Sequence, residues 1–263
     1  SDVPVPQGTQ VLMKVLAVGV CHSDLHIWDG YYEMGGGKRL NLINRGIQLP
    51  LTMGHEHVGE VVALGPESTG VRVGDVRLVH PLIGCGQCKA CQRDEENLCG
   101  KPQSMGVYAQ GGYATHMVVP HPRHLFGLGR LSPREAAPLA CSGVTAFAAL
   151  KKVVPALKGE PLVIIGAGGV GLLGVRLARK MGVNDVIVVD IDAAKREAAL
   201  QAGATQVIDG AAAVAAKQIQ AATAGGAWGV IDFVGAGSTA YLAMAAITKG
   251  GTIVVVGLFG GEV

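Results

Sequence analysis

Cysteine placement constrains this chain more than any other sequence feature, because all six cysteines fall into two potential metal-binding sets. The first set is one short run with the spacing C-x2-C-x2-C-x7-C: Cys85, Cys88, Cys91 and Cys99. Sulfurs two residues apart can converge on one tetrahedral ion, and the fourth returns after a loop, so the run predicts a closed, structural zinc site. Four cysteines within fifteen residues argue against unrelated buried thiols. A zinc ribbon that binds nucleic acid would carry comparable cysteines, so the run predicts a metal but no function.

The other two cysteines, Cys21 and Cys141, stand alone, with the tripeptide Gly54-His55-Glu56 between them in sequence. Two cysteines and one histidine leave one of the four zinc positions open for chemistry, whereas four thiolates close the shell. Convergence of these three residues is a hypothesis, because they lie far apart in the chain. A lone buried cysteine is by default a small hydrophobe, and a satisfied core histidine is the alternative for His55.

The chain has 263 residues, 49% of them hydrophobic, and its 22 basic and 20 acidic residues give a net charge of +2. This length suits two domains, and the balanced charge predicts neither a nucleic-acid partner nor an acidic tail. No apolar stretch reaches the ~18 residues of a membrane span. Residues 1–19 lack a charged start followed by an apolar core and a cleavage site. The clustered cysteines therefore favour metal ligation in a reducing cytosol over a disulfide framework.

The residue pattern changes near residue 142. Over residues 1–142, short β-rich runs at 11–18, 58–64 and 116–119 alternate with glycine and proline, which predicts a strand-dominated, loop-rich domain. Over residues 143–263, strand and helix patterns alternate, which predicts a parallel, doubly wound α/β sheet. The expected strands of this sheet are residues 161–165, 185–190, 206–208, 230–234 and 252–256. The expected helices are residues 143–154, which join the two domains, 170–181, 193–202, 211–223 and 238–247.

A glycine-rich turn at residues 166–171 follows the first of these strands and opens a helix, the context in which such a turn binds a dinucleotide. Its glycines allow close approach of a pyrophosphate, which the free N–H groups of the helix N-terminus stabilise. The residues of this turn expected to contact the cofactor are Gly166, Gly168, Gly169, Val170 and Gly171. Asp190 ends the next strand, where a carboxylate can hydrogen-bond a ribose diol and repel a 2′-phosphate. No arginine follows at residues 191–192, so we expect NAD rather than NADP.

Four features resemble, in order and content, the zinc-containing alcohol dehydrogenases of the medium-chain dehydrogenase/reductase family. They are the run Cys21-His22-Ser23-Asp24-Leu25-His26, the Gly54-His55-Glu56 sequence, the four-cysteine run and the dinucleotide turn. The resemblance covers nearly the whole chain. It implies a GroES-like catalytic domain over residues 1–142 and a Rossmann NAD-binding domain over residues 143–263. It also implies two zinc ions per chain, a catalytic one on Cys21, His55 and Cys141 and a structural one on the four-cysteine run.

The same resemblance gives roles to the neighbours of the ligands. Ser23 would accept the proton of the substrate hydroxyl, and His26 would pass it towards solvent; an ordinary surface or core position is the alternative for His26. Asp24 would orient the imidazole of His55, and Glu56 would adjust the zinc environment. Zinc lowers the pKa of a bound water from ~15.7 to ~7 in favourable sites, so an alcohol can lose its proton near neutral pH.

For the cofactor, the resemblance implies that Thr145 and His22 lie near NAD, that Val170 packs behind the nicotinamide, and that Lys195 lies near the adenosine ribose. The alternative interpretation of Lys195 is a surface lysine without a role in binding, and that of His22 is an ordinary surface or core residue. Trp28 resembles an aromatic residue that narrows the substrate pocket in some members, with a core aromatic as the alternative. Ordinary surface or core positions are expected for the remaining histidines: His57, His80, His116, His121 and His124.

Two departures from the family pattern limit what the resemblance implies. Residues 31–50 make the segment between Cys21 and His55 unusually long, and their composition predicts a surface loop that reshapes the substrate entrance. Family members usually begin with another strand or two and continue well beyond the last expected strand. The fold therefore looks truncated at both ends, with the C-terminal part of the Rossmann domain missing, and we expect either part of a longer protein or a fragment.

We therefore expect reversible oxidation of a primary or secondary alcohol to an aldehyde or ketone, with hydride transfer to NAD. A polyol, an aromatic alcohol or an acyl-CoA-linked alcohol is the alternative substrate, and an inactive truncated relative that only binds zinc is the alternative function. The family further implies a small-molecule substrate, no nucleic-acid or membrane partner, and a cytoplasmic homo-oligomer, either a tetramer or a dimer.

Overall fold

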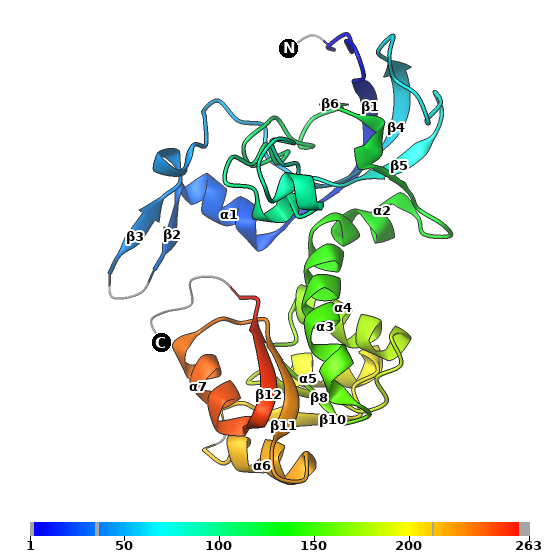
Figure 1. Cartoon of the computed structure of the whole chain (residues 1–263). Coiled ribbons are helices and arrows are strands. Elements are labelled where there is room, and N and C mark those ends of the chain that lie inside the picture. The colour runs from blue at the N-terminus through cyan, green and yellow to red at the C-terminus, as the bar shows by residue number, and fades with distance from the viewer. Residues whose placement is uncertain (1–2, 35–36, 212, 258–263) are drawn as a thin grey trace. The chain divides into compact units, whose positions relative to one another are not determined.

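The computed structural model describes residues 3–34, 37–211 and 213–257. The chain divides into two compact units, one of residues 1–31 and 41–141 and the other of residues 32–40 and 142–263. Each unit has its own sheet (Figure 1). Each unit also has its own hydrophobic core. Each therefore has the organisation of a separate domain.

The first unit is built on an antiparallel five-stranded sheet in the order β6-β1-β4-β5-β7. Its strands are β1 Val11–Gly19, β4 Glu56–Leu64, β5 Val76–Val79, β6 His116–Val119 and β7 Leu125–Gly127. Val11 and Met13 of β1 point to one face of the sheet, because side chains alternate along a strand, and both are fully buried in its core. The strands predicted at residues 11–18, 58–64 and 116–119 are confirmed.

The segment predicted as a surface loop, residues 31–50, contains regular structure instead. Helix α1, His22–Asp29, precedes it and ends at Gly30, whose φ is 81°. The segment then forms a hairpin of two short strands and one 3-10 turn: β2 Tyr31–Glu33, β3 Arg39–Asn41 and η1 Ile43–Arg45. The loop prediction is wrong because cross-strand contacts, such as the ion pair of Glu33 with Arg39 at 2.8 Å, stabilise a ladder that composition does not reveal. Residues 35–36 of this segment lie outside the described residues.

The first unit also contains several short helical turns. They are η2 Cys91–Arg93, η3 Glu96–Leu98, η4 Pro122–His124, α2 Pro133–Ala136 and η5 Ala137–Ala140. Helix α2 begins after Ser132, whose side chain and that of Glu135 form a capping box. Turn η5 packs against β4 and leads directly to Cys141. This contact brings the end of the first unit onto the strand that follows His55.

The second unit is built on a parallel five-stranded sheet in the order β10-β9-β8-β11-β12. Its strands are β8 Leu162–Ile165, β9 Val186–Asp190, β10 Gln206–Asp209, β11 Ala227–Asp232 and β12 Ile247–Val255. Its helices are α3 Ser142–Leu157, α4 Gly169–Lys180, α5 Ala193–Ala202, α6 Ala215–Ala222 and α7 Gly237–Ala246. Leu162 and Ile164 of β8 pack in a core with α3 and α4, whereas Val163 and Ile165 pack in a second core with α6 and α7. The predicted doubly wound sheet, covered by helices on both faces, is confirmed.

Some predicted element ends differ from the structure. Strand β12 begins at residue 247 rather than 252, because Ala227 of β11 already pairs with Ile247. The register then shifts, and Gly229 pairs with Thr252. Strand β11 begins at 227 rather than 230 for the same reason. Helix α6 begins at 215 rather than 211. Residue 212 of the predicted helix 211–223 lies outside the described residues.

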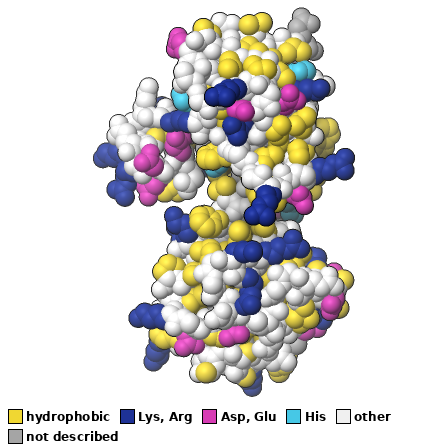
Figure 2. Space-filling view, turned by 90° about the vertical axis from the view of Figure 1, so that its right-hand side faces the viewer, with side chains coloured by type: hydrophobic (Ala, Val, Ile, Leu, Met, Phe, Trp, Pro, Cys, Tyr) yellow, Lys and Arg dark blue, Asp and Glu magenta, His cyan; other side chains and the backbone are white. Residues whose placement is uncertain are grey.

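The visible surface in Figure 2 carries Lys and Arg side chains among Asp and Glu side chains. This mixture agrees with the small net charge of +2. Within the part of the chain that the structure describes, no single helix has both the length and the apolar composition needed to cross a membrane. The consecutive segments Pro133–Ala140 and Ser142–Leu157 reach that length and composition only when joined across a bend.

Candidate metal centres and cofactor pocket

The four-cysteine run folds into a cluster whose sulfurs all lie within 4.8 Å of one another: Cys85, Cys88, Cys91 and Cys99. The Cys88 sulfur lies 3.5 Å from the Cys91 sulfur and 3.8 Å from the Cys99 sulfur. Four sulfurs bound at ~2.3 Å around a tetrahedral zinc lie about 3.8 Å apart. The donor set and its spacing therefore fit a structural zinc ion.

Backbone groups hold the sulfurs of this cluster. The N–H groups of Cys85 and Lys101 each donate to the Cys99 sulfur at 3.3 Å. Hydrogen bonds from backbone N–H groups, first that of Gln87, lower the pKa of Cys85 to about 6. Burial raises the pKa of Cys91. Zinc binding requires all four thiols to lose their protons, so metal binding to this cluster is expected to weaken as the pH falls.

Glu96, in the loop between the third and fourth cysteines, ties the cluster to the rest of the first unit. Its carboxylate accepts the N–H of Gly84 at 2.8 Å and pairs with Arg123 at 3.1 Å. Gly84 directly precedes Cys85, and Arg123 belongs to η4. The position of the cluster is thus fixed by charged side chains as well as by its sulfurs.

The second candidate centre consists of Cys21, His55 and Cys141, whose ligand atoms all lie within 4.8 Å of one another. The two sulfurs are 3.9 Å apart, close to the spacing of about 3.8 Å on a tetrahedral zinc. The sheet explains the approach of the first two residues, because Gly19 at the end of β1 pairs with Glu56 at the start of β4. Cys141 joins them because η5 packs against β4.

Asp24 lies behind His55 and is only 3% exposed. Its Oδ1 is 3.2 Å from Nδ1 of His55, and its Oδ2 accepts the N–H of Cys21 at 2.9 Å and the hydroxyl of Tyr113 at 2.9 Å. A carboxylate only accepts hydrogen bonds, so Nδ1 of His55 carries the hydrogen. Nε2 is then the nitrogen of His55 that can bind a metal ion.

Electrostatics at this centre favour the metal-binding form of cysteine. The pKa of Cys21 is lowered to about 4, first by the hydrogen bond with the Cys141 thiol and then by His55, although burial raises it. Burial alone would lower the pKa of His55, but hydrogen bonds with Asp24 and Cys21 raise it to about 10. The thiolate is the form that binds zinc, and the proton on His55 is released when a metal takes its place.

Glu56 follows His55 and is 3% exposed. Its carboxylate lies against Gly19 so closely that a Cβ at residue 19 would collide with Oε2 of Glu56. The structure therefore places Glu56 in the wall of the site, where β1 and β4 meet.

The predicted proton-relay residues, Ser23 and His26, lie on α1 directly after Cys21 and are both partly buried. The rings of His22 and His26 stack with their centroids 4.8 Å apart. Burial and the neighbouring His22 lower the pKa of His26. Trp28, on the same helix, is 79% exposed, which excludes the alternative of a core aromatic.

A pocket of about 660 Å³ lies in the second unit and includes three of the predicted cofactor residues, Gly166, Asp190 and Lys195, in its wall. Both oxygens of Asp190 are held by backbone groups. Oδ2 accepts the N–H of Ala167 at 2.7 Å, and Oδ1 accepts the N–H of Asp192 at 2.9 Å. A fixed carboxylate at the end of β9 is suited to hydrogen-bond the hydroxyls of a ribose.

The glycine turn has the expected geometry for a pyrophosphate. Helix α4 begins at Gly169, and its N-cap residue, Gly168, has no side chain to satisfy the N–H groups of the first turn. A Cβ at Gly171 would collide with the carbonyl oxygen of Gly166, so only glycine allows the turn to close. Thr145 lies on α3 and His22 on α1, and neither is among the described residues that line the pocket.

Sequence reasoning missed three residues at these sites: Tyr113, Arg196 and Asp209. The hydroxyl of Tyr113 donates to Asp24 across 89 residues of chain, and no spacing signal marks it. Arg196 donates to the carbonyl oxygen of Asp190 at 2.8 Å and pairs with Asp209 at 3.4 Å. Asp209 was detectable, because it ends the strand β10 just as Asp190 ends β9, and the two residues pair in register.

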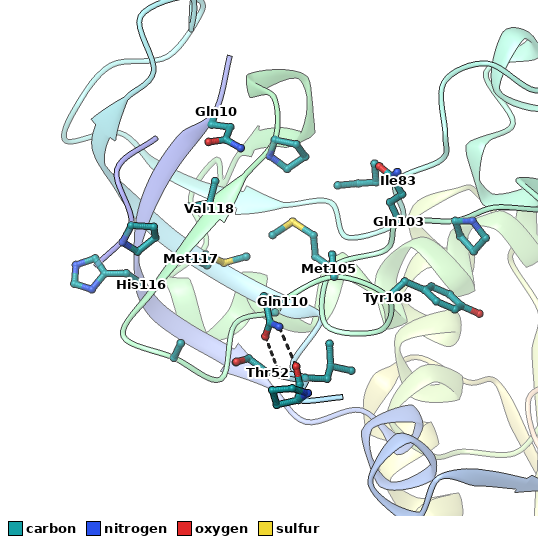
Figure 3. Close-up of a pocket in the computed structure, with 18 residues that line it drawn as sticks. Gln10, Thr52, Ile83, Gln103, Met105, Tyr108, Gln110, His116, Met117 and Val118 are labelled. Carbon is teal, nitrogen blue, oxygen red and sulfur yellow. Dashed lines mark hydrogen bonds between the residues drawn. The ribbon is translucent and has the colours of Figure 1, made fainter. Parts of the chain in front are cut away.

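A larger pocket of about 940 Å³ lies in the first unit (Figure 3). Gln10, Met105, His116 and Met117 are among its lining residues, and Gln110 in its wall accepts the N–H of Thr52 at 2.7 Å. None of the candidate metal ligands lines it. Size alone therefore does not identify the chemical site of this unit.

Comparison with known proteins matches both units. Residues 7–129 match the family model described as "Alcohol dehydrogenase GroES-like domain", and residues 169–263 match "Zinc-binding dehydrogenase". The NAD-dependent alcohol dehydrogenase of Sulfurisphaera tokodaii is 39% identical over 99% of this chain and 74% of its own length. The NAD-dependent alcohol dehydrogenase of Saccharolobus solfataricus is 38% identical over the same shares.

Solved structures agree with the sequence relatives. The D-arabinose dehydrogenase from Sulfolobus solfataricus matches with a TM-score of 0.89 and 32% identity, over 100% of this chain and 79% of that one. The alcohol dehydrogenase from Aeropyrum pernix matches with a TM-score of 0.85 and 31% identity, over 100% of this chain and 75% of that one. The chain therefore belongs to the zinc-binding alcohol dehydrogenases of the medium-chain dehydrogenase/reductase family, with a GroES-like domain and a Rossmann-like domain.

Proposed function

We propose that this protein is a zinc-dependent alcohol dehydrogenase that catalyses the reversible oxidation of a primary or secondary alcohol to an aldehyde or ketone, with NAD as hydride acceptor. The observation that carries the proposal is the grouping of Cys21, His55 and Cys141 within 4.8 Å, with Asp24 behind His55. Three protein ligands and one open position are the arrangement of a catalytic rather than a structural zinc.

We propose two zinc ions per chain, one for each of the two donor sets. Cys21, His55 and Cys141 would hold the catalytic ion, and the four-cysteine cluster the structural one. When bound, the catalytic zinc supplies a Lewis acid that polarises the substrate oxygen, and NAD supplies the acceptor for the hydride.

The protein's own residues prepare the substrate and move its proton. Asp24 keeps Nδ1 of His55 protonated and so directs Nε2 to the metal position. The Oγ of Ser23 accepts the hydroxyl proton of the alcohol, and the imidazole of His26 carries it to solvent. A lowered pKa of His26 keeps this imidazole neutral, and so able to accept a proton, at neutral pH. Glu56 adjusts the charge around the ligands from the wall of the site.

Cofactor binding rests on the glycine turn and Asp190. The turn from Gly166 to Gly171 receives the pyrophosphate at the start of α4, and Asp190 holds the ribose hydroxyls of the adenosine. The fixed negative charge of Asp190 disfavours a 2′-phosphate, so NAD is preferred over NADP. Thr145, Val170 and His22 are proposed to contact the nicotinamide end, and Lys195 the adenosine ribose.

The names of the relatives agree on the reaction class but not on a single substrate. Three relatives at 36–39% identity are named NAD-dependent alcohol dehydrogenases. Others at 32–34% identity are named D-arabinose 1-dehydrogenase (NADP(+)) and L-threonine 3-dehydrogenase. A sugar or polyol is therefore the second candidate substrate, ahead of an aromatic or acyl-CoA-linked alcohol.

The function is tested by following NADH absorbance with the purified protein and a panel of primary and secondary alcohols, polyols and threonine. Cys21→Ala and His55→Ala should each abolish turnover and leave NAD binding, measured by cofactor fluorescence, unchanged. Retained turnover in either variant contradicts the proposed metal site. Metal analysis separates the enzyme from a module that only binds zinc, since the enzyme should hold two zinc ions per chain.

We further propose that the protein works as a homo-oligomer of two or four chains in the reducing cytoplasm. The family resemblance and the grouping of the cysteines into two potential metal-binding sets support this setting. Sedimentation equilibrium at micromolar concentration tests the assembly, and a single monomeric species contradicts it.

A further inference from the structure

The position of the Asp24 carboxylate depends on Tyr113, a residue outside the set of candidate metal ligands. Tyr113 donates its hydroxyl to Oδ2 of Asp24 at 2.9 Å, and the same hydroxyl lies 3.3 Å from the carbonyl oxygen of Gly19. A hydrogen bond to a charged carboxylate is the stronger of these two contacts. The Tyr113 hydroxyl therefore restrains the carboxylate whose other oxygen orients His55.

Backbone contacts fix the position of Tyr113. Its N–H donates to the carbonyl oxygen of Met53 at 2.9 Å, and the N–H of Gly112 donates to that of Gly54 at 2.8 Å. These two bonds place the aromatic ring on Gly54, the residue before His55. A Cβ at Gly54 would lie 2.7 Å from the ring, and the φ of +91° at this position also favours glycine. The tyrosine is thus held against the backbone of the ligand while its hydroxyl reaches Asp24.

We infer that Tyr113 is a positioning residue of the catalytic metal centre: through Asp24, its hydroxyl keeps the ring of His55 in the orientation that binds the ion. This inference rests on the proposed function, because it assumes that His55 is a ligand. It assigns Tyr113 no contact with substrate or cofactor. Partners that act through a ligand in this way typically change metal affinity or activity by about 10–100-fold when removed.

The structure offers a matched pair of substitutions. Tyr113→Phe removes the hydroxyl and keeps the ring on Gly54. Tyr108→Phe removes a hydroxyl from the wall of the pocket of about 940 Å³ in the same unit, which Asp24 does not line. Both variants delete one oxygen atom from a tyrosine in the same domain, so a difference between them reports the contact with Asp24.

The experiment follows zinc release from the fully loaded protein into a chromogenic chelator. The four-cysteine cluster provides an internal reference for the release rate, because it should release its zinc at the same rate in all variants. In Tyr113→Phe we expect the other zinc to leave about 10–100-fold faster than in the unmodified protein, whereas Tyr108→Phe should match the unmodified protein. A cobalt-substituted sample should show an altered visible spectrum only for Tyr113→Phe.

A double-mutant cycle with Asp24→Asn separates positioning from a general loss of stability. If Tyr113 acts through Asp24, Tyr113→Phe should accelerate zinc release much less in the Asp24→Asn background than alone. Additive effects, or release from Tyr113→Phe at the unmodified rate, overturn the inference and leave the proposed function intact. Unmodified protein that holds only the structural zinc overturns both.

Discussion

Nδ1 of His55 lies 3.2 Å from Oδ1 of Asp24, and these residues are only 5% and 3% exposed. A buried pair of this kind is costly to break, because removal of one partner leaves the other without a compensating charge or hydrogen bond. The pair also decides which nitrogen of His55 is available to a metal. The metal centre and the stability of the first unit are therefore coupled through this contact.

Replacement of Asp24 should weaken zinc binding at the catalytic metal centre. In Asp24→Ala the imidazole of His55 loses its partner, and we expect zinc affinity at this centre to fall by about 10–100-fold. Equilibrium dialysis followed by metal analysis measures the effect, with about one zinc per chain expected for the variant and two for the unmodified protein. Asp29→Ala, on the exposed end of the same helix, is the control and should retain both ions. Full zinc retention by Asp24→Ala would contradict the assigned role.

Loss of the four-cysteine cluster should lower the thermal stability of the protein and leave the catalytic metal centre intact. Cys88→Ser removes one of four ligands, and loss of a metal site is among the few single changes that cost more than about 4 kcal/mol. At about 2–4 °C per kcal/mol for a chain of this size, the melting temperature should fall by on the order of 10 °C. Calorimetry with zinc analysis measures both properties. An unchanged melting temperature would show that the cluster does not support the fold.

The choice between NAD and NADP should depend on Asp190. Asp190→Ser removes the charge that faces the 2′ position, so kcat/KM should fall at least about 10-fold for NAD and rise for NADP. Glu197→Gln removes an exposed charge from α5 at a residue that does not line the pocket of Asp190, and should leave the ratio unchanged. Because Arg196 is paired with Asp209, Asp209→Asn should increase the use of NADP further when combined with Asp190→Ser. No change in the NAD to NADP ratio for Asp190→Ser would refute this assignment.

Acid should destabilise the first unit through His124. Burial, with the adjacent Arg123, lowers the pKa of this 5% exposed imidazole from 6.5 to about 4. The folded pKa lies below the unfolded one, so the unfolded state takes up more protons between pH 6.5 and 4. Stability from this group is present above pH 6.5 and is lost as the pH falls, by about 2 kcal/mol at pH 5.

Urea unfolding at pH 7 and pH 5 tests this prediction. His124→Gln should reduce the loss of stability between the two pH values, because the variant has no imidazole to protonate. His121→Gln, an exposed neighbour, is the control. Equal pH dependence in His124→Gln and the unmodified protein would exclude His124 as the source.

Local patterns were sufficient to predict much of the architecture. The expected strands and helices of the parallel sheet depend on runs of apolar residues, which act over a few neighbouring positions. The four-cysteine cluster forms within fifteen residues, and the glycine turn within six, so their spacing already specifies which atoms meet. The hairpin within residues 31–50 escaped prediction because cross-strand pairing stabilises it, which composition does not show.

Residue types and spacing alone indicated that this chain can hold one closed metal cluster. They also marked Cys21, His55 and Cys141 as candidate ligands of a second metal site with one open position. Only the tertiary structure decided that sulfurs 120 residues apart lie 3.9 Å from each other, because pairing of β1 with β4 and packing of η5 on β4 bring them together. The same long-range contacts place the Tyr113 hydroxyl on Asp24. Contacts of this kind depend on the register and packing of elements distant in sequence, and a single sequence carries no local signal for them.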